Sequence, residues 1–423
     1  MSASSVLLEP PPEVLGSFAA PRVMDLLRVV LVRTMGELST MRLLMLSTSG
    51  EPCGIADYNS MLGAAFVGLG RSTEIVRIPR FDPAGLATAC EVFRGRLLEF
   101  DLGLVQHEWG FFGSEFRQSA KCFTEFLKSL RNATPVAIIM HTGFPILPRS
   151  RTMSFFSRNA KIRAAKRAMV SAINHRARVF THGDTAREQL IGRGVRRDRV
   201  EAVMFPLTAQ CDVAKPRPLT AQDPVQLAIF GFVSAYKGYE TVLNAIRLLP
   251  DNVTLVIAGG KHPCNSGDKT LDSILGFLHT GAWSRPTMPR LPGRFTSADR
   301  DRLRKRVRIT GYLSQTEMVN ILNGTDIALA IYSEGPPGSA ALGQMLSLGR
   351  PVIASTITAF REVQQHGNCL KLIPARAPFE LTELILALIR DHAERLRLHE
   401  NALAFARKHT FEALAQYIVK TMK

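Results

Sequence analysis

The chain of 423 residues has few cysteines, and none of them form a pair at CxxC spacing. Close pairs are the usual sign of a zinc site or of a disulfide framework, so their absence argues against both. We therefore expect reduced thiols in a cytoplasmic protein and no metal site. The six cysteines are Cys53, Cys90, Cys122, Cys211, Cys264 and Cys369.

Long apolar runs are also missing. No stretch approaches the ~20 uninterrupted apolar residues of a membrane-spanning helix. Residues 1–40 contain a proline-rich piece and one short apolar segment, which Arg28 and Arg33 interrupt. That pattern is too broken for a secretory signal. We expect this extension either to be poorly ordered or to lie ahead of a translation start at Met41.

Acidic residues are in deficit, with 36 Asp and Glu against 53 Lys and Arg and a net charge of +17. Such an excess implies an anionic partner, and acidic lipid, phosphorylated substrates and nucleic acid all fit. Nucleic acid is the weakest of the three because no recognised binding module is present. Residues 151–178 hold basic side chains without any acid, which predicts a basic amphipathic helix. Its basic side is either a solvated face or a patch for an anionic membrane surface or a phosphorylated acceptor.

What the chain contains instead is a regular alternation of apolar strands and helical patterns. The expected strands are 41–47, 73–77, 102–105, 136–140, 179–181 and 202–205, then one beginning at 225, followed by 253–260, 307–314, 327–331 and 351–354. This alternation predicts an α/β fold with two Rossmann-like doubly wound parallel-sheet domains that face one another across a cleft.

The expected domain boundaries follow from composition. The N-terminal Rossmann-like domain spans 41–210, a proline-rich linker spans 211–224, and the C-terminal Rossmann-like domain spans 225–405. A terminal helix at 406–423 would cross back to the first domain. Residues 261–305 exceed an ordinary connection, so we expect an insertion with one helix near 271–278.

The most informative stretch is 325–355, which predicts a strand, a loop, a helix and a second strand. Pro336 and Pro337 cannot extend a helix, whereas Gly338 and Ser339 can open one. The free amides of the following turn would then point toward the carboxyl edge of the sheet, where open α/β folds bind ligands. Such amides favour an anion, most often a phosphate.

Two phosphate-binding fingerprints are absent. Neither half of the chain carries GxGxxG or a P-loop with its Lys-Ser/Thr pair, which argues against a dinucleotide enzyme and an ATPase. The stretches that are present are CGIADY, QHEWGFFG, MHTGFP, FGFVSAYKGYETVLNAI, ITGYLSQTEM and GSAALGQMLSLGRPVIAS. In this order and spacing, the chain from about Met41 onward resembles the glycosyltransferase family 4 (group 1) proteins of the GT-B fold.

The resemblance implies a glycosyltransferase of hexosyltransferase type (EC 2.4). The donor would be a nucleotide-diphosphate sugar (a UDP- or GDP-sugar), held mainly by the second domain. The acceptor would be a glycan, glycolipid or other molecule, held mainly by the first. The family retains configuration and has no tightly bound cofactor, and polysaccharide or glycoconjugate biosynthesis is its usual setting. The protein would then be cytoplasmic, with peripheral membrane binding through the basic helix as a further expectation.

The resemblance also suggests site residues. Lys237 would contact the donor diphosphate, and His141 would lie near the donor sugar, with Glu334 as a further catalytic candidate. The donor-binding candidates are Gly54, Phe232, Lys237, Gly311, Tyr312, Leu313, Gly335, Gly338, Ser339, Ala340 and Gln344. The acceptor-side candidates, chosen because they follow first-domain strands, are Asp57, His107 and Glu108.

Three positions depart from the family pattern. Gln344 stands where members have a ribose-binding acid, Pro336 stands where a first acid is expected, and Phe232 replaces a common arginine. Glu334 fits the first acid only with a two-residue insertion, whereas the Gln344 amide can still both donate to and accept from a ribose. A GT-B-fold protein that binds a nucleotide sugar with little or no transfer is therefore the alternative function.

Overall fold

The computed structural model describes residues 41–48, 54–79, 82–143, 153–210, 213–261, 267–284, 286–289, 295–335 and 338–423. Side chains are described from residue 160 onward in the helix that begins at 153. The expected extension at 1–40, three of the six cysteines and the two prolines of the 333–338 loop lie outside the described residues.

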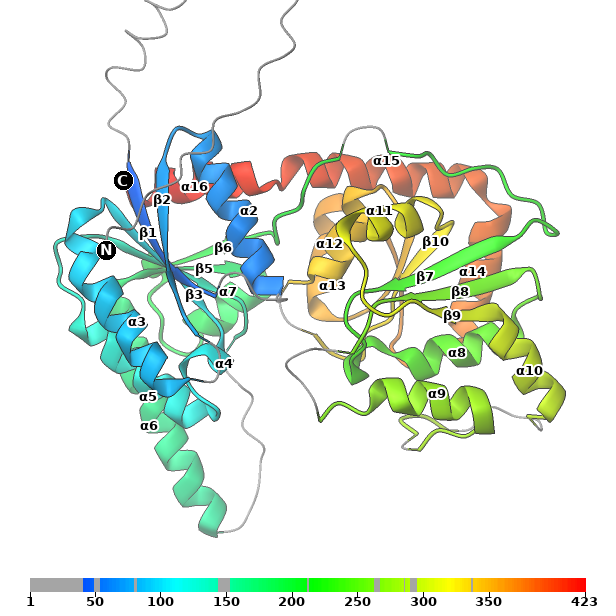
Figure 1. Cartoon of the computed structure of the whole chain (residues 1–423), viewed down its shortest axis with the longest axis horizontal. Coiled ribbons are helices and arrows are strands. Elements are labelled where there is room, and N and C mark those ends of the chain that lie inside the picture. The colour runs from blue at the N-terminus through cyan, green and yellow to red at the C-terminus, as the bar shows by residue number, and fades with distance from the viewer. Residues whose placement is uncertain are drawn as a thin grey trace, which may run out of the picture. The chain divides into compact units, whose positions relative to one another are not determined.

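The first sheet has six parallel strands in the order β2-β1-β3-β4-β5-β6. They are β1 (Arg42–Ser47), β2 (Ser72–Arg77), β3 (Leu102–His107), β4 (Val136–Met140), β5 (Arg178–His182) and β6 (Val200–Val203). Every residue of β3 and β4 is buried, because helices cover both faces of a parallel sheet (Figure 1). Those helices are α2 (Gly54–Gly68), α3 (Pro83–Arg96), α4 (Trp109–Phe112), α5 (Phe116–Ser129), α6 (Met153–Arg176) and α7 (Asp184–Ile191).

The second sheet repeats this plan in the order β12-β11-β10-β7-β8-β9, again with all neighbours parallel. Its strands are β7 (Val225–Phe230), β8 (Val253–Ala258), β9 (Val307–Ile309), β10 (Ile327–Ala330), β11 (Val352–Ser355) and β12 (Leu370–Ile373). Its helices are α8 (Tyr239–Leu248), α9 (Thr270–Thr280), α10 (Ser297–Arg306), α11 (Gln315–Asn323), α12 (Ala340–Ser347), α13 (Thr358–Gly367), α14 (Pro378–Arg390) and α15 (His392–Lys408), with the 3-10 turn η3 (Ala235–Lys237) after β7. The expected α/β fold with two doubly wound sheets is confirmed.

Each sheet has one point where the strand order reverses. In the first sheet the reversal lies between β1 and β3, and in the second it lies between β7 and β10. Ligands of open α/β sheets bind at the carboxyl ends of the strands beside such a reversal. The segments that follow these four strands all contribute to the site described below, together with segments that follow neighbouring strands.

Two expectations about the second domain were wrong. The segment 261–305 holds a second helix, α10, which begins with a capping box between Thr296 and Asp299. It was missed because α10 buries only Leu303 and Arg306, so its sequence has almost no apolar periodicity. The strand expected over 307–314 ends at Ile309, because Gly311 takes a φ of +75° and Ser314 already caps α11.

The helix expected over 151–178 is present as α6, but it is not clearly amphipathic, since Lys166 among its basic side chains is buried. Its described buried residues include Met169, Val170 and Ile173, and this side packs against α5, while Lys161 and Arg167 are exposed. No helix among the described residues is both long and apolar enough to cross a bilayer.

The last helix, α16 (Phe411–Met422), packs against α2 of the first sheet (Figure 1). Just before it, the amide of Leu207 donates to the carbonyl of His409 at 2.7 Å. The chain therefore returns to the first-sheet side after α15. The boundaries at 210, 225 and 405 stay predictions, since the strands and helices do not by themselves define where a domain ends.

Candidate functional site

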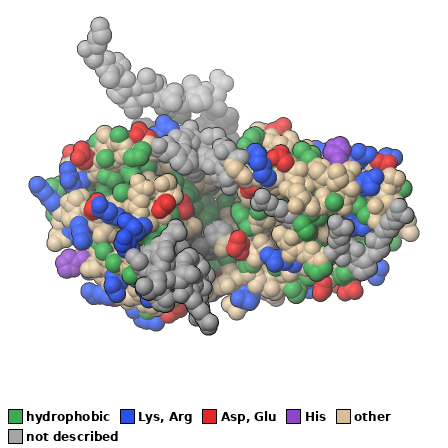
Figure 2. Space-filling view, turned by 90° about the horizontal axis from the view of Figure 1, so that it is seen from below, with side chains coloured by type: hydrophobic (Ala, Val, Ile, Leu, Met, Phe, Trp, Pro, Cys, Tyr) green, Lys and Arg blue, Asp and Glu red, His purple; other side chains and the backbone are tan. Residues whose placement is uncertain are grey.

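A cavity of about 670 Å³ is lined by residues at the carboxyl ends of strands in both sheets, at the two reversal points and beside them. From the first sheet come the start of α2, the residues after β3 and β4, and the end of β5. From the second come the loop after β7, the loop after β9 and the start of α12. Figure 2 shows a hollow with hydrophobic side chains inside it on one face of the molecule. A cavity of this size accommodates a drug-sized ligand.

Lys237 lies on η3 at the second-domain wall of this cavity, with only 3% of its surface exposed. Its Nζ donates a hydrogen bond to the carbonyl oxygen of Phe230 at 2.8 Å. Burial lowers the pKa of Lys237 to about 7. Gly231 makes room for the amine, because a Cβ at that position would lie 2.7 Å from Nζ. Lys237 is thus a buried amine that can take up a proton when an anion arrives.

The start of α12 lies on the same wall. The Ser339 hydroxyl caps the helix by accepting from the amide of Leu342 at 3.2 Å. The preceding amides, those of Ala340 and Ala341, belong to residues that line the cavity and have no intrahelical partner by position. Together with the helix dipole they favour a negative group at this end of the cavity. A glycine is required at position 338, because a Cβ there would collide with the ring of Phe205.

The first-domain wall carries His141 at the end of β4. His141 is 8% exposed, and its Nε2 lies 2.7 Å from Oε1 of Gln106. Burial lowers the pKa of His141 well below its ordinary value, and His182 adds to the effect. His141 is therefore a neutral imidazole that can exchange hydrogen bonds with a sugar but carries no charge.

Two carboxyl groups line the same wall. Glu108 caps α4 by accepting from the amide of Trp109 at 3.0 Å, and both of its oxygens accept from the Thr142 hydroxyl at 3.1 Å. Burial raises the pKa of Glu108, and burial also raises the pKa of Asp57 in the first turn of α2. Glu108 is held by protein groups, whereas the exposed Asp57 side chain is open to a ligand.

Several other expected residues also line the cavity. Gly54 opens α2, and a Cβ there would meet no atom within 4 Å, which leaves space for a ligand beside the helix start. Phe232 and Tyr312 meet edge to face with ring centroids 6.2 Å apart, and Leu313 follows them. Gln344 lines the cavity from the second turn of α12. The structure brings these residues together, but their contacts with a ligand stay a prediction.

His107 is placed elsewhere and is not an acceptor-side residue in this structure. Its ring is fully buried among Trp109, Phe112 and Phe123, with centroid distances of 4.6, 5.6 and 4.4 Å. Burial lowers its pKa to about 3. Successive side chains of a strand point to opposite faces, so Gln106 is on the His141 side and His107 is not.

Three loop residues also lie off the cavity wall. Glu334 and Gly335 are exposed beside the part of their loop that is not described, and Gly311 precedes Tyr312 in the chain without lining the cavity. Position after a strand predicted the right loops, but it could not predict which residue of a loop turns inward.

Sequence reasoning missed Tyr58 and His182, which also line the cavity. Their rings lie 4.9 and 5.6 Å from that of His141, and burial lowers the pKa of His182 to about 4. His182 ends β5, so the rule that selected His141 from the end of β4 would have selected it too. Tyr58 had no such signal, since it faces inward from the second turn of α2.

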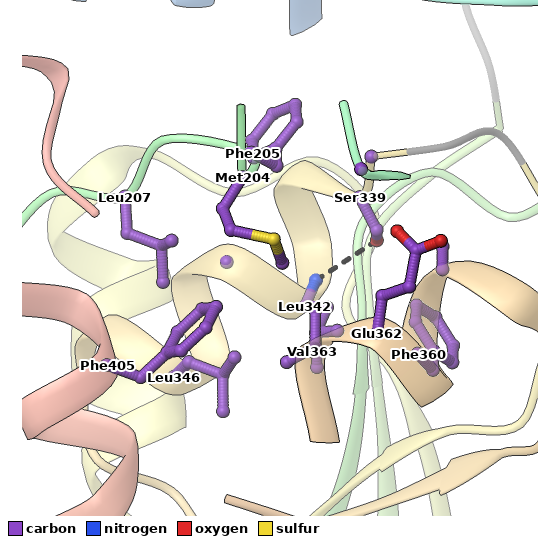
Figure 3. Close-up of a pocket in the computed structure, with 14 residues that line it drawn as sticks. Met204, Phe205, Leu207, Ser339, Leu342, Leu346, Phe360, Glu362, Val363 and Phe405 are labelled. Carbon is purple, nitrogen blue, oxygen red and sulfur yellow. Dashed lines mark hydrogen bonds between the residues drawn. The ribbon is translucent and has the colours of Figure 1, made fainter. Parts of the chain in front are cut away.

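A small second pocket of about 20 Å³, enough for about one water molecule, adjoins the main cavity. Figure 3 shows Phe205, Met204 and Leu207 opposite the side chains of α12 and α13. In the same region Glu362 of α13 accepts from the amide of Thr185 at 2.8 Å, at the start of α7. A Cβ at Gly183 would collide with the Glu362 carboxylate. This contact joins the helices of the two sheets.

No group of three or more His, Cys, Asp or Glu side chains within the described part of the chain is arranged to hold a metal ion. The cavity offers amides, one amine, neutral imidazoles and aromatic rings, which suit a ligand with an anionic part and a hydroxyl-bearing part.

Comparison with known proteins agrees with this description. Residues 224–391 match the family model described as glycosyl transferases group 1. A phosphatidyl-myo-inositol mannosyltransferase of Mycobacterium leprae is 25% identical over 114 residues, which are 27% of this chain and 30% of that protein. The alignment thus spans less than a third of the relative.

Solved structures show the same fold over almost the whole chain. HepE of Anabaena in complex with UDP-glucose has a TM-score of 0.62 at 17% identity, covering 90% of this chain and 99% of HepE. Sucrose-phosphate synthase of Thermosynechococcus elongatus has a TM-score of 0.64 at 15% identity, covering 90% and 98%. Residues 224–391 are therefore similar to the group 1 glycosyltransferases, and the chain as a whole has the GT-B fold of these solved structures.

Proposed function

We propose that this protein transfers a sugar from a nucleotide-diphosphate sugar to an acceptor. The observation that carries the proposal is the pairing, across one cavity, of Lys237 and the start of α12 with His141 and the start of α2. One wall is suited to phosphates and the other to sugar hydroxyls. The UDP-glucose bound to HepE supports a UDP-sugar as the first donor to test.

The phosphate wall would act on the leaving group. When the bond between sugar and diphosphate breaks, negative charge grows on the departing oxygen. A protonated Lys237 and the free amides at Ala340 and Ala341 would stabilise this charge. Because the amine is held by the Phe230 carbonyl before the donor binds, it needs little reorganisation.

The sugar wall would orient the donor and the acceptor. His141 would hydrogen-bond a sugar hydroxyl, and Asp57 would receive the acceptor hydroxyl. Glu108 would hold the loop after β3 against Thr142. The family resemblance supports retention of configuration, a glycan or glycolipid acceptor, and a place in polysaccharide or glycoconjugate biosynthesis in the cytoplasm.

The test is a panel of UDP- and GDP-sugars with purified protein, read by thermal stabilisation and by release of the nucleotide. We expect at least one donor to raise the melting temperature and to release nucleotide slowly. Lys237→Met should lower kcat/KM about 100-fold, as for the loss of one charge-stabilising group. Lys420→Met, at an exposed site on α16, is the control. A panel in which no donor has either effect would contradict the proposal.

The second candidate is a nucleotide-sugar-binding protein without transfer, which Phe232 and Gln344 favour. Both line the cavity where the family has an arginine and an acid. Under this candidate, donors stabilise the fold but release no nucleotide. Gln344→Glu decides between weakened and lost activity, because a gain in turnover would show that the remaining machinery works. Turnover by the wild-type protein rejects the candidate outright.

A further inference from the structure

A buried chain of side-chain amides lies behind His141. Nε2 of His141 is 2.7 Å from Oε1 of Gln106, and Nε2 of Gln106 donates to Oδ1 of Asn59 at 3.4 Å. Gln106 and Asn59 are fully buried and come from β3 and α2. Neither lines the cavity. They can therefore act on a ligand only through His141.

The hydrogen bonds that link His141, Gln106 and Asn59 have a defined donor and acceptor at each step. Oε1 of Gln106 is an acceptor without a hydrogen, so with this oxygen toward His141 the proton between the two residues belongs to Nε2 of His141. In the same orientation, Nε2 of the Gln106 amide donates to Oδ1 of Asn59. A neutral imidazole carries one proton, so Nδ1 is left as an acceptor.

We propose that Gln106 and Asn59 are positioning residues that hold His141 as the Nε2–H tautomer, so that Nδ1 accepts a hydrogen bond from a substrate hydroxyl. The identity of the ligand rests on the proposed function, but the tautomer does not.

The surroundings of His141 keep it neutral. Tyr58 of α2 meets it edge to face, and His182 of β5 is the nearest other titratable ring, with His107 of β3 behind them. None of these groups is an anion at neutral pH, since burial also raises the pKa of Tyr58 and lowers the pKa of His182 to about 4. The ring is therefore suited to hydrogen bonding rather than to donating a proton as an imidazolium.

The direct test is NMR of the full-length protein labelled with ¹⁵N-histidine, with His141 assigned from the spectrum of His141→Gln. We expect a protonated Nε2 and an unprotonated Nδ1, unchanged between pH 8 and pH 6. Gln106→Met keeps the length of the side chain but removes the acceptor, and it should give a mixture of tautomers. Asn59→Leu should also give a mixture of tautomers, because it removes the acceptor that orients Gln106. Asn59→Asp keeps an acceptor and should give the wild-type signal.

The surface substitution Gln416→Met serves as the control, and circular dichroism checks that each variant folds. In the same variants, Gln106→Met should raise the donor KM about three- to tenfold, the worth of one hydrogen bond. An Nδ1–H tautomer in the wild-type protein, or no change of tautomer in Gln106→Met, would overturn the proposal. A correct tautomer with no donor binding would instead refute the proposed function and leave the tautomer assignment standing.

Discussion

Single residues decide how much of the cavity is available to an anion. Gly231, at a φ of +92°, gives Lys237 its place, and Gly338 leaves room for Phe205 beside the start of α12. A Cβ at Gly231 would meet the Lys237 amine, and a Cβ at Gly338 would meet the ring of Phe205. The Lys237 amine is then desolvated so strongly that its pKa falls to about 7.

This pKa predicts proton uptake on donor binding. At pH 8 the free Lys237 is mostly neutral, and a bound diphosphate favours its charged form, so binding of UDP should take up close to one proton. At pH 6 the amine is already charged and uptake should fall toward zero. Calorimetry of UDP binding in buffers of different ionisation enthalpy measures this number at each pH.

Lys237→Met should remove the uptake at pH 8 while the protein stays folded. Removing a buried amine should also change the pH dependence of stability. Because the folded-state pKa is depressed, the unfolded chain binds more protons between pH 7 and 10, so wild-type stability relative to Lys237→Met should rise over that range. A flat difference would mean that the amine is not buried as described.

Among the elements, the N-termini of three helices carry the unpaired amides that a ligand or a cap must satisfy. α2 and α12 begin at the cavity, and α7 begins at the carboxylate of Glu362. A helix N-terminus has unpaired amides and a partial positive charge, so it needs an anion or a cap. α12 has its own cap in Ser339, whereas α7 begins at Gly183 without a side-chain cap and receives Glu362 from α13 instead.

We predict that Glu362→Ala weakens the contact between the helices of the two sheets. The lost hydrogen bond to a charged group should lower the free energy of unfolding by about 1–3 kcal/mol. The midpoint of urea unfolding measures the loss, and small-angle scattering should show a larger radius of gyration. Glu383→Ala, at an exposed site on α14, should change neither quantity. Equal effects of the two substitutions would refute the role of Glu362.

For the whole molecule, the charge and the cavity are separate features. The chain carries a net charge of +17, yet the only Lys or Arg among the described residues of the cavity wall is Lys237. The excess positive charge therefore lies elsewhere, and α6 carries Lys161 and Arg167 at exposed positions. Anionic lipid would attract such a surface by about 1 kcal/mol per basic side chain.

We predict that the protein cosediments with vesicles of anionic phosphatidylglycerol and not with vesicles of neutral phosphatidylcholine. Binding should weaken as salt rises, because the attraction is screened within a Debye length. Replacing Lys161 and Arg167 by Glu should lower the affinity for anionic vesicles at least tenfold. Replacing Lys128 and Lys420 by Glu, which changes the net charge equally, should have a smaller effect. Equal losses in both double variants would assign the binding to net charge rather than to α6.

The sequence determined the two sheets and the loops that carry the site. Apolar runs such as that of β10, bounded by turn residues, are typical of buried parallel strands, and the glycines and Ser339 mark where helices begin. The fold class and the loops after β1, β4, β7 and β10 could therefore be predicted. α10 could not, since its polar surface hides the helical period.

Only the tertiary structure decided which residues face the cavity. Gln106 and His107 are neighbours in sequence, but one supports His141 while the other is buried among aromatic rings, because a strand turns successive side chains to opposite faces. Tyr58 and His182 reach His141 from α2 and β5, two elements far apart in the chain. The contact of Glu362 with Thr185 likewise joins residues separated by 177 positions. Local patterns determine elements, whereas a site forms from residues that only packing brings together.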